Sequence, residues 1–107
     1  MSKKLLVASV VFLSCNFVAH AADAAFNTGK ISAILENCPA WKLTEDAANG
    51  PWPYLVDEYG ETDEFAAGRA DTMKYIQSRG SAELKQDCEE WFQAMYASGI
   101  RYFERRQ

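Results

Sequence analysis

Histidine is nearly absent from this chain, and cysteine is scarce. Its 107 residues include one histidine, His20, and three cysteines, Cys15, Cys38 and Cys88. A catalytic thiol or serine needs a neighbouring base, usually histidine, and a zinc site needs four ligands that are mostly cysteine and histidine. A C-x-x-C redox motif is also missing. These absences predict a protein that is not an enzyme and that carries no metal and no cofactor.

The chain has one long apolar run, and it lies at the N-terminus. Lys3 and Lys4 precede an apolar segment over residues 5–13, and the triplet Ala19-His20-Ala21 follows. This order of basic, apolar and small residues is typical of a cleaved secretory signal peptide, and a membrane-spanning helix would be longer. The sequence predicts a signal peptide over residues 1–21 and a single small domain over residues 22–107. Leu13-Ser14-Cys15 loosely matches a lipidation motif, so lipidation at Cys15 remains an alternative.

Cleavage after Ala21 would change the chemistry of the chain. His20 and Cys15 would be lost, and residues 22–107 contain nine basic and fifteen acidic residues. This negative charge disfavours nucleic acid and anionic membrane surfaces as partners, and it favours a basic protein. The short leader with its alanine-rich end predicts an exported bacterial protein, in the periplasm or released from the cell.

The stretch Lys85-Gln86-Asp87-Cys88-Glu89-Glu90-Trp91-Phe92 raises the question of what Cys88 does. Cysteines of an exported protein normally pair, and the mature chain has only Cys38 as a partner for Cys88. Without histidine, neither thiol has a catalytic base or enough companions for a zinc site. We therefore expect a structural disulfide between Cys38 and Cys88.

Helical periodicity marks two strong segments and one weaker one. A helix is expected over residues 28–38, with Thr28 as its N-cap and Pro39 beyond its end. Its apolar stripe consists of Ile31, Ile34, Leu35 and Cys38. The strongest stripe begins after Ser81, which we expect to cap its helix, and consists of Leu84, Cys88, Trp91, Met95, Ser98 and Tyr102, with Phe92 and Tyr96 widening it. Between them, Thr62 is the expected N-cap of a helix over residues 63–79, with a stripe of Phe65, Ala66, Arg69 or Ala70, Met73 and Ile76.

The middle of the chain predicts shorter elements. Thr44 can cap one helical turn over residues 44–48, and a short helix is expected over residues 53–59 with Pro53 at its first position and Gly60 past its end. No segment predicts a convincing strand. The expected fold is all-α, a small bundle of three main helices plus one or two short helices, cross-linked by one disulfide.

An acidic run follows the short helix. It contains Asp57, Glu58, Glu61, Asp63 and Glu64, and its spacing does not match a calcium-binding loop. These carboxylates are the candidate rim for a basic protein partner, and Trp52 or Tyr59 is the candidate aromatic anchor. Two purely structural interpretations remain open: the carboxylates form a solvated loop, and the aromatic residues hold the middle segment against the core.

Two functions follow from these features. The first is an exported binding domain that inhibits a basic cell-envelope protein of the cell-wall hydrolase type, or serves as an immunity protein against it. The second rests on Cys38 and Cys88 in the helical contexts "LENC" and "LKQDC", with about 50 residues between them, in a small exported chain. This architecture resembles the periplasmic acid-stress chaperones of the HdeA/HdeB type, and the resemblance implies a helical fold that loosens when carboxylates are protonated. The segment from Trp41 to Tyr59 departs from that family. A small exported protein with some other role is the third alternative.

Overall fold

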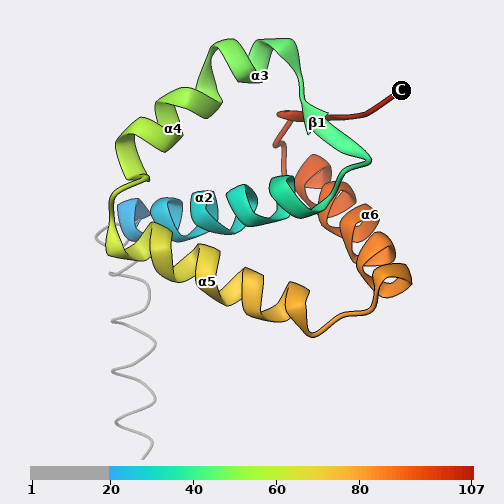
Figure 1. The fold of residues 1–107 in the computed structure, drawn as a ribbon. Helices are drawn as coiled ribbons and strands as arrows, with labels where there is room; N and C mark the ends of the chain where they lie inside the picture. The colour runs from blue at the N-terminus through green and yellow to red at the C-terminus, as the bar shows by residue number, and fades with distance from the viewer. Residues whose placement is uncertain (1–19) are drawn as a thin grey trace, which may run out of the picture.

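The computed structural model describes residues 20–107, and these form five helices and one two-stranded ribbon (Figure 1). The predicted signal peptide and Cys15 lie outside these residues, except for His20 and Ala21. The elements follow one another along the chain as α2 (His20–Asn37), β1 (Trp41–Leu43), α3 (Glu45–Asn49), α4 (Pro51–Tyr59), α5 (Asp63–Gln77), α6 (Ser81–Ala97) and β2 (Phe103–Arg105). The helical class is therefore confirmed, with three long and two short helices in the described part of the chain.

The backbones of α2 and α5 meet at two glycines. A Cβ atom added to Gly29 would lie 2.0 Å from the carbonyl oxygen of Phe65, and one added to Gly68 would lie 2.0 Å from that of Phe26. Only glycine fits at either position, because the obstructing atoms belong to the other helix's backbone. Gly68 therefore takes a place in the α5 stripe, together with Thr72 and Ile76, which are buried. The prediction that Ala66 belongs to this stripe was wrong, since it is exposed. Of the two alternatives for the next position, Arg69 is half-buried and Ala70 is exposed.

The two crossing helices run in the same direction, as Figure 1 shows. Beyond the glycine crossing, contacts advance toward the C-terminal ends of both helices, from Glu36 with Arg69 to Asn37, whose amide lies 3.2 Å from the Met73 sulfur. Parallel neighbours need a long connection that returns the chain to the starting end. Here β1, α3 and α4 supply that return, and Figure 1 shows them arching over α2.

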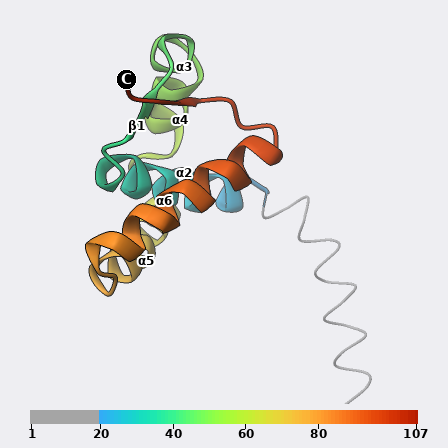
Figure 2. The ribbon, with the colours of Figure 1, turned by 90° about the vertical axis from the view of Figure 1, so that its right-hand side faces the viewer.

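A second packing surface joins α2 to α6, which crosses it in Figure 2. Its buried centre is formed by Ile34, Cys38, Cys88 and Phe92. The predicted disulfide between Cys38 and Cys88 is present, with their Cα atoms 5.8 Å apart. Trp41 stacks on Phe92 with ring centroids 4.4 Å apart, and Phe103 meets Phe92 edge-on at 5.0 Å. The disulfide therefore sits within the main apolar cluster of the described residues.

Contrary to the expectation of no strand, β1 and β2 form a short antiparallel ribbon. Trp41 pairs with Arg105 and Leu43 with Phe103. Gly99, at φ 89°, follows the end of α6, and the chain then leaves the helix axis. Tyr102 and Ser98 consequently do not continue the α6 stripe. Each strand has only three residues, and this length is too short for an alternating pattern to stand out in the sequence.

Several helix ends differ from their predicted positions. Thr28 is not an N-cap: α2 begins earlier, and the buried Thr28 hydroxyl donates to the Ala24 carbonyl at 2.7 Å. Pro51, rather than Pro53, starts α4, and Gly80, rather than Ser81, caps α6. The caps predicted at Thr44 and Thr62 are confirmed, since each hydroxyl accepts from a backbone N–H at 3.1 Å.

Replacing Gly68 by alanine tests the close crossing of α2 and α5. The added methyl group would collide with the Phe26 carbonyl, so we expect the free energy of unfolding to fall by about 3 kcal/mol despite the better helix propensity of alanine. Urea denaturation measures this change. Ala70→Ser on the exposed side of the same helix is the control, with an expected loss of about 0.5 kcal/mol. Equal stabilities of the two variants would contradict the crossing.

Reduction of the disulfide tests how strongly it stabilises the fold. Cys38 and Cys88 are 50 positions apart, and closing a loop of that length stabilises a protein by roughly 4 kcal/mol in the chain-entropy model. We expect oxidised protein of residues 22–107 to unfold at clearly higher urea concentration than the reduced protein. Identical unfolding curves would show that the bond does not stabilise the fold.

Candidate functional site

The candidate partner surface is the segment from Thr44 to Glu64, which we call the acidic arm. It contains α3, α4 and the start of α5, and it is fixed at its two ends by the caps at Thr44 and Thr62. Ala47 is its only buried residue, and none of the residues of α4 is buried. The arm therefore contributes little to the core and presents most of its surface to solvent.

The acidic arm carries negative charge without compensation. Its seven carboxylates belong to Glu45, Asp46, Asp57, Glu58, Glu61, Asp63 and Glu64, and it contains no lysine or arginine. None of the ion pairs among residues 20–107 involves these carboxylates. The candidate rim residues Asp57, Glu58, Glu61, Asp63 and Glu64 are all exposed. A surface of this kind attracts a basic partner over several ångströms before contact is made.

The aromatic side chains of the arm separate onto two faces of α4. Trp52 and Tyr59, the predicted anchors, are half-buried together with Leu55 and Val56, at the i, i+3, i+4 and i+7 spacing of one helix face. Tyr54 lies on the other face and is 69 % exposed. Trp52 and Tyr59 are therefore partly covered, and Tyr54 is the exposed aromatic ring of the arm. Its spacing of three and four residues from Asp57 and Glu58 is the sequence signal that reveals this face.

Arginine–carboxylate pairs join the elements outside the arm. Arg69 of α5 binds Glu36 of α2 with two hydrogen bonds, one of them 2.8 Å long. Arg105 of β2 binds Glu89 of α6 in the same way, at 2.6 and 2.9 Å. In each pair the hydrogen bonds from the arginine lower the pKa of the carboxyl group. Both carboxylates therefore favour their ionised form in the folded protein.

A third arginine pair joins the end of α5 to α6. Arg79 donates to Asp87 at 2.8 Å, and the Tyr75 hydroxyl donates to the same carboxylate at 3.1 Å. The hydrogen bond from Arg79 is the main cause that lowers the pKa of Asp87, and the Tyr75 hydroxyl adds to it. Asp87 is itself buried. The carboxylate of Asp87, which favours its ionised form, thus links α6 to Tyr75 of α5 and to Arg79 just beyond the end of α5.

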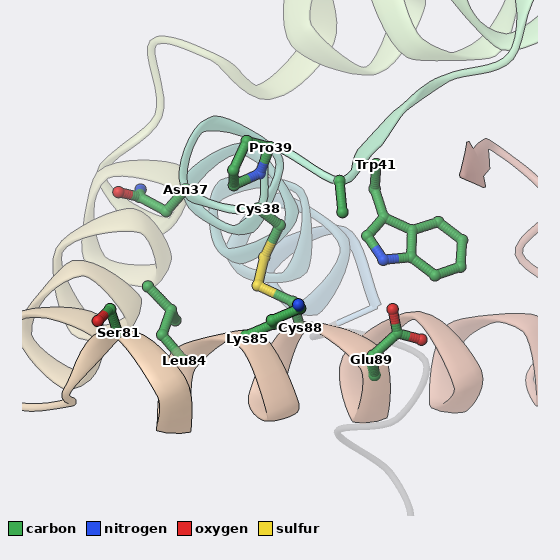
Figure 3. Close-up of a pocket in the computed structure, with 10 residues that line it drawn as sticks. Asn37, Cys38, Pro39, Trp41, Ser81, Leu84, Lys85, Cys88 and Glu89 are labelled. Atoms are coloured by element: carbon green, nitrogen blue, oxygen red, sulfur yellow. A yellow bond between two sulfur atoms is a disulfide. The ribbon is translucent and has the colours of Figure 1, made fainter. Parts of the chain in front are cut away.

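An apolar groove of about 420 Å³ opens beside the disulfide (Figure 3). The two cysteines, Leu84, Pro39 and Trp41 form much of its wall, and Lys85 and Glu89 lie at its rim. The indole N–H of Trp41 is buried without an acceptor in hydrogen-bond geometry; it faces Glu89 and helps to lower the pKa of that carboxyl group. The rim has one charge of each sign, so the groove favours no charged ligand.

The described residues contain no cluster of three or more histidine, cysteine or acidic side chains placed to hold a metal ion. Within the same residues, no helix is both long and apolar enough to span a membrane. Comparisons with protein-family models, with curated proteins and with solved structures found no match to this chain.

Proposed function

We propose that the mature chain is an exported, non-enzymatic binding domain that inhibits or neutralises a basic protein of the cell envelope, of the cell-wall hydrolase type. The observation that carries this proposal is the acidic arm, with seven carboxylates, no basic residue and no ion pair. Exposed carboxylates accelerate association with a basic partner and disfavour acidic competitors. The disulfide supports export, because such bonds persist in oxidising compartments.

The division of charge within the molecule supports the same proposal. Three of the four described ion pairs connect different segments of the chain. Their arginines are Arg69, Arg79 and Arg105. Arginine therefore pairs with carboxylates outside the acidic arm, whereas none of the carboxylates of the arm makes an ion pair with the described residues. A surface that keeps seven like charges unpaired lowers the stability of the free protein, and a basic partner would relieve that repulsion.

The three lowered carboxyl pKa values favour a second candidate, the acid-stress chaperone. Glu36, Asp87 and Glu89 each hold a junction between elements by accepting from an arginine. Because their pKa values are lowered by folding, their stabilisation is present above the ordinary carboxyl pKa of about 4 and is lost as the pH falls through the folded-state values. Acid would then loosen three junctions together and expose apolar surface to client proteins.

Neutralising the arm tests the first candidate. The triple variant Asp57→Asn, Glu58→Gln, Glu61→Gln should bind a basic envelope protein about tenfold or more weakly at low salt, because each exposed charge pair adds a fraction of a kcal/mol. The variant leaves Asp63 and Glu64 in place, since they stabilise the first turn of α5. The wild-type domain, immobilised, should retain a basic protein from envelope extract and inhibit its activity when both are purified.

The control for this experiment removes the same number of charges elsewhere. Asp71→Asn, Glu90→Gln, Glu104→Gln changes exposed carboxylates that make no ion pair with the described residues. It should keep nearly all of the binding. Equal binding by the two triple variants, or no basic protein retained by the wild type at low salt, would contradict the proposal.

An acid titration tests the second candidate. Between about pH 4 and pH 2 we expect the near-ultraviolet circular dichroism signal to fall while a hydrophobic dye binds. Asp87→Asn removes one arginine pair at every pH, so its stability deficit relative to wild type should be largest near neutral pH and shrink in acid. A rigid fold at pH 2 that binds no dye would exclude acid activation.

A further inference from the structure

Tyr54 differs from the other exposed aromatic side chains of this protein. Three large apolar side chains are exposed among the described residues, and all are tyrosines: Tyr54 at 69 %, Tyr96 at 60 % and Tyr75 at 43 %. The Arg101 guanidinium lies 3.7 Å from the Tyr96 ring centroid, and that of Arg79 lies 5.5 Å from the Tyr75 ring. Within residues 20–107, no cation–π contact covers Tyr54.

No basic residue lies near Tyr54 in the sequence. The acidic arm contains no lysine or arginine, and the nearest basic residues in sequence are Lys42 and Arg69. Arg69 is already committed to Glu36. The most exposed aromatic ring of the described residues therefore stands in a segment from which positive charge is absent.

Two carboxylates stand beside this ring. Asp57 and Glu58 follow Tyr54 by three and four residues in α4, so their side chains emerge next to it on the same helix face. Both are exposed, and neither makes an ion pair with the described residues. Glu61 follows in the turn after the helix and adds a further negative charge.

We propose that this outer face of α4 receives an arginine side chain of a basic protein partner. The guanidinium would stack on the Tyr54 ring while its N–H groups donate to Asp57 or Glu58. The inference rests on the proposed binding function and deepens it, because it names the residue class of the partner and the contact that anchors it. No residue of α4 is buried, so the site forms without rearrangement of the core.

The chemistry favours arginine over lysine at this position. A guanidinium is planar, so it lies flat on an aromatic ring while its edge still donates to a carboxylate. The ammonium of lysine is compact and more strongly hydrated, and it loses more hydration when it leaves water. The protein already uses arginine in this way, since Arg79 lies over Tyr75 while it binds Asp87. Tyr54 with Asp57 and Glu58 offers the same combination without the arginine.

The test uses tetra-arginine amide and tetra-lysine amide as probes, at low salt, with the oxidised protein of residues 22–107. Nuclear magnetic resonance of the tyrosine rings follows the titration. We expect a saturable shift of the Tyr54 ring, little change at Tyr96, and about fivefold tighter binding of the arginine peptide than of the lysine peptide.

Two substitutions of the ring distinguish stacking from mere apolar contact. Tyr54→Leu keeps an apolar side chain but removes the aromatic face, so the arginine peptide should bind about fivefold more weakly, close to the lysine peptide. Tyr54→Phe should retain the preference for arginine. Tyr96→Ala, at a similarly exposed tyrosine of α6, should leave the affinity of both peptides unchanged.

The outcomes separate this inference from the proposed function. The arginine site is contradicted if the Tyr54→Leu protein binds the arginine peptide as tightly as wild type, or if wild type binds the two peptides equally. Either result leaves intact the proposal that the acidic arm binds basic proteins. If neither peptide binds wild type at low salt, the inference and the proposed function both fail.

Discussion

The covalent bond between Cys38 and Cys88 ties the end of α2 to α6. Cys38 directly follows the last residue of α2, and Cys88 lies in the second turn of α6, so the bond joins two helices that are far apart in the sequence. Ile34, Phe92 and Trp41 gather around it and form the apolar cluster. A domain of this size buries few large side chains, and its core alone stabilises it only marginally. The disulfide adds a covalent constraint to this small core.

The acidic arm is a consequence of how α2 and α5 pack. Gly29 and Gly68 let the two backbones touch, and the helices run in parallel, so the chain must travel back along α2 before α5 can begin. That return path cannot also lie in the core, because the two helices already cover each other there. It crosses the surface as α3 and α4, with hydroxyl caps at its ends and almost no buried residues. The topology thus places the most acidic segment of the protein where a partner can reach it.

Ion pairs are distributed unevenly over the described residues. Arginine residues close the junctions α2–α5, α5–α6 and α6–β2 by binding Glu36, Asp87 and Glu89. The same guanidinium groups lie over Tyr75 and Trp41 in two of these places. The arm uses neither device and leaves Tyr54 and seven carboxylates without a cation among the described residues. Arginine pairs with carboxylates outside the acidic arm, and the arm itself contains no arginine. This difference is the physical basis for the proposal that a partner supplies an arginine to the arm.

Much of this architecture could be predicted from local patterns. The helical class, the caps at Thr44 and Thr62 and the disulfide pairing each depend on neighbouring residues or on a single possible partner. The patterns failed where distant segments meet. Ala66 was predicted to face the core, yet it is exposed and Gly68 faces α2, because the fit depends on the backbone of another helix. The strands Trp41–Leu43 and Phe103–Arg105 are far apart in the sequence, and neither has a local sequence pattern that predicts their pairing.

The candidate site also has features that the sequence determines and features that only the tertiary structure determines. The sequence alone determined that the segment from Thr44 to Glu64 is acidic and lacks basic residues, since charge is a property of composition. Only the tertiary structure decided that Trp52 and Tyr59 turn partly inward and that Tyr54 faces solvent, because exposure depends on which side of α4 lies against the rest of the protein. The inward side of α4 is the one that meets α2, an element remote from it in the sequence.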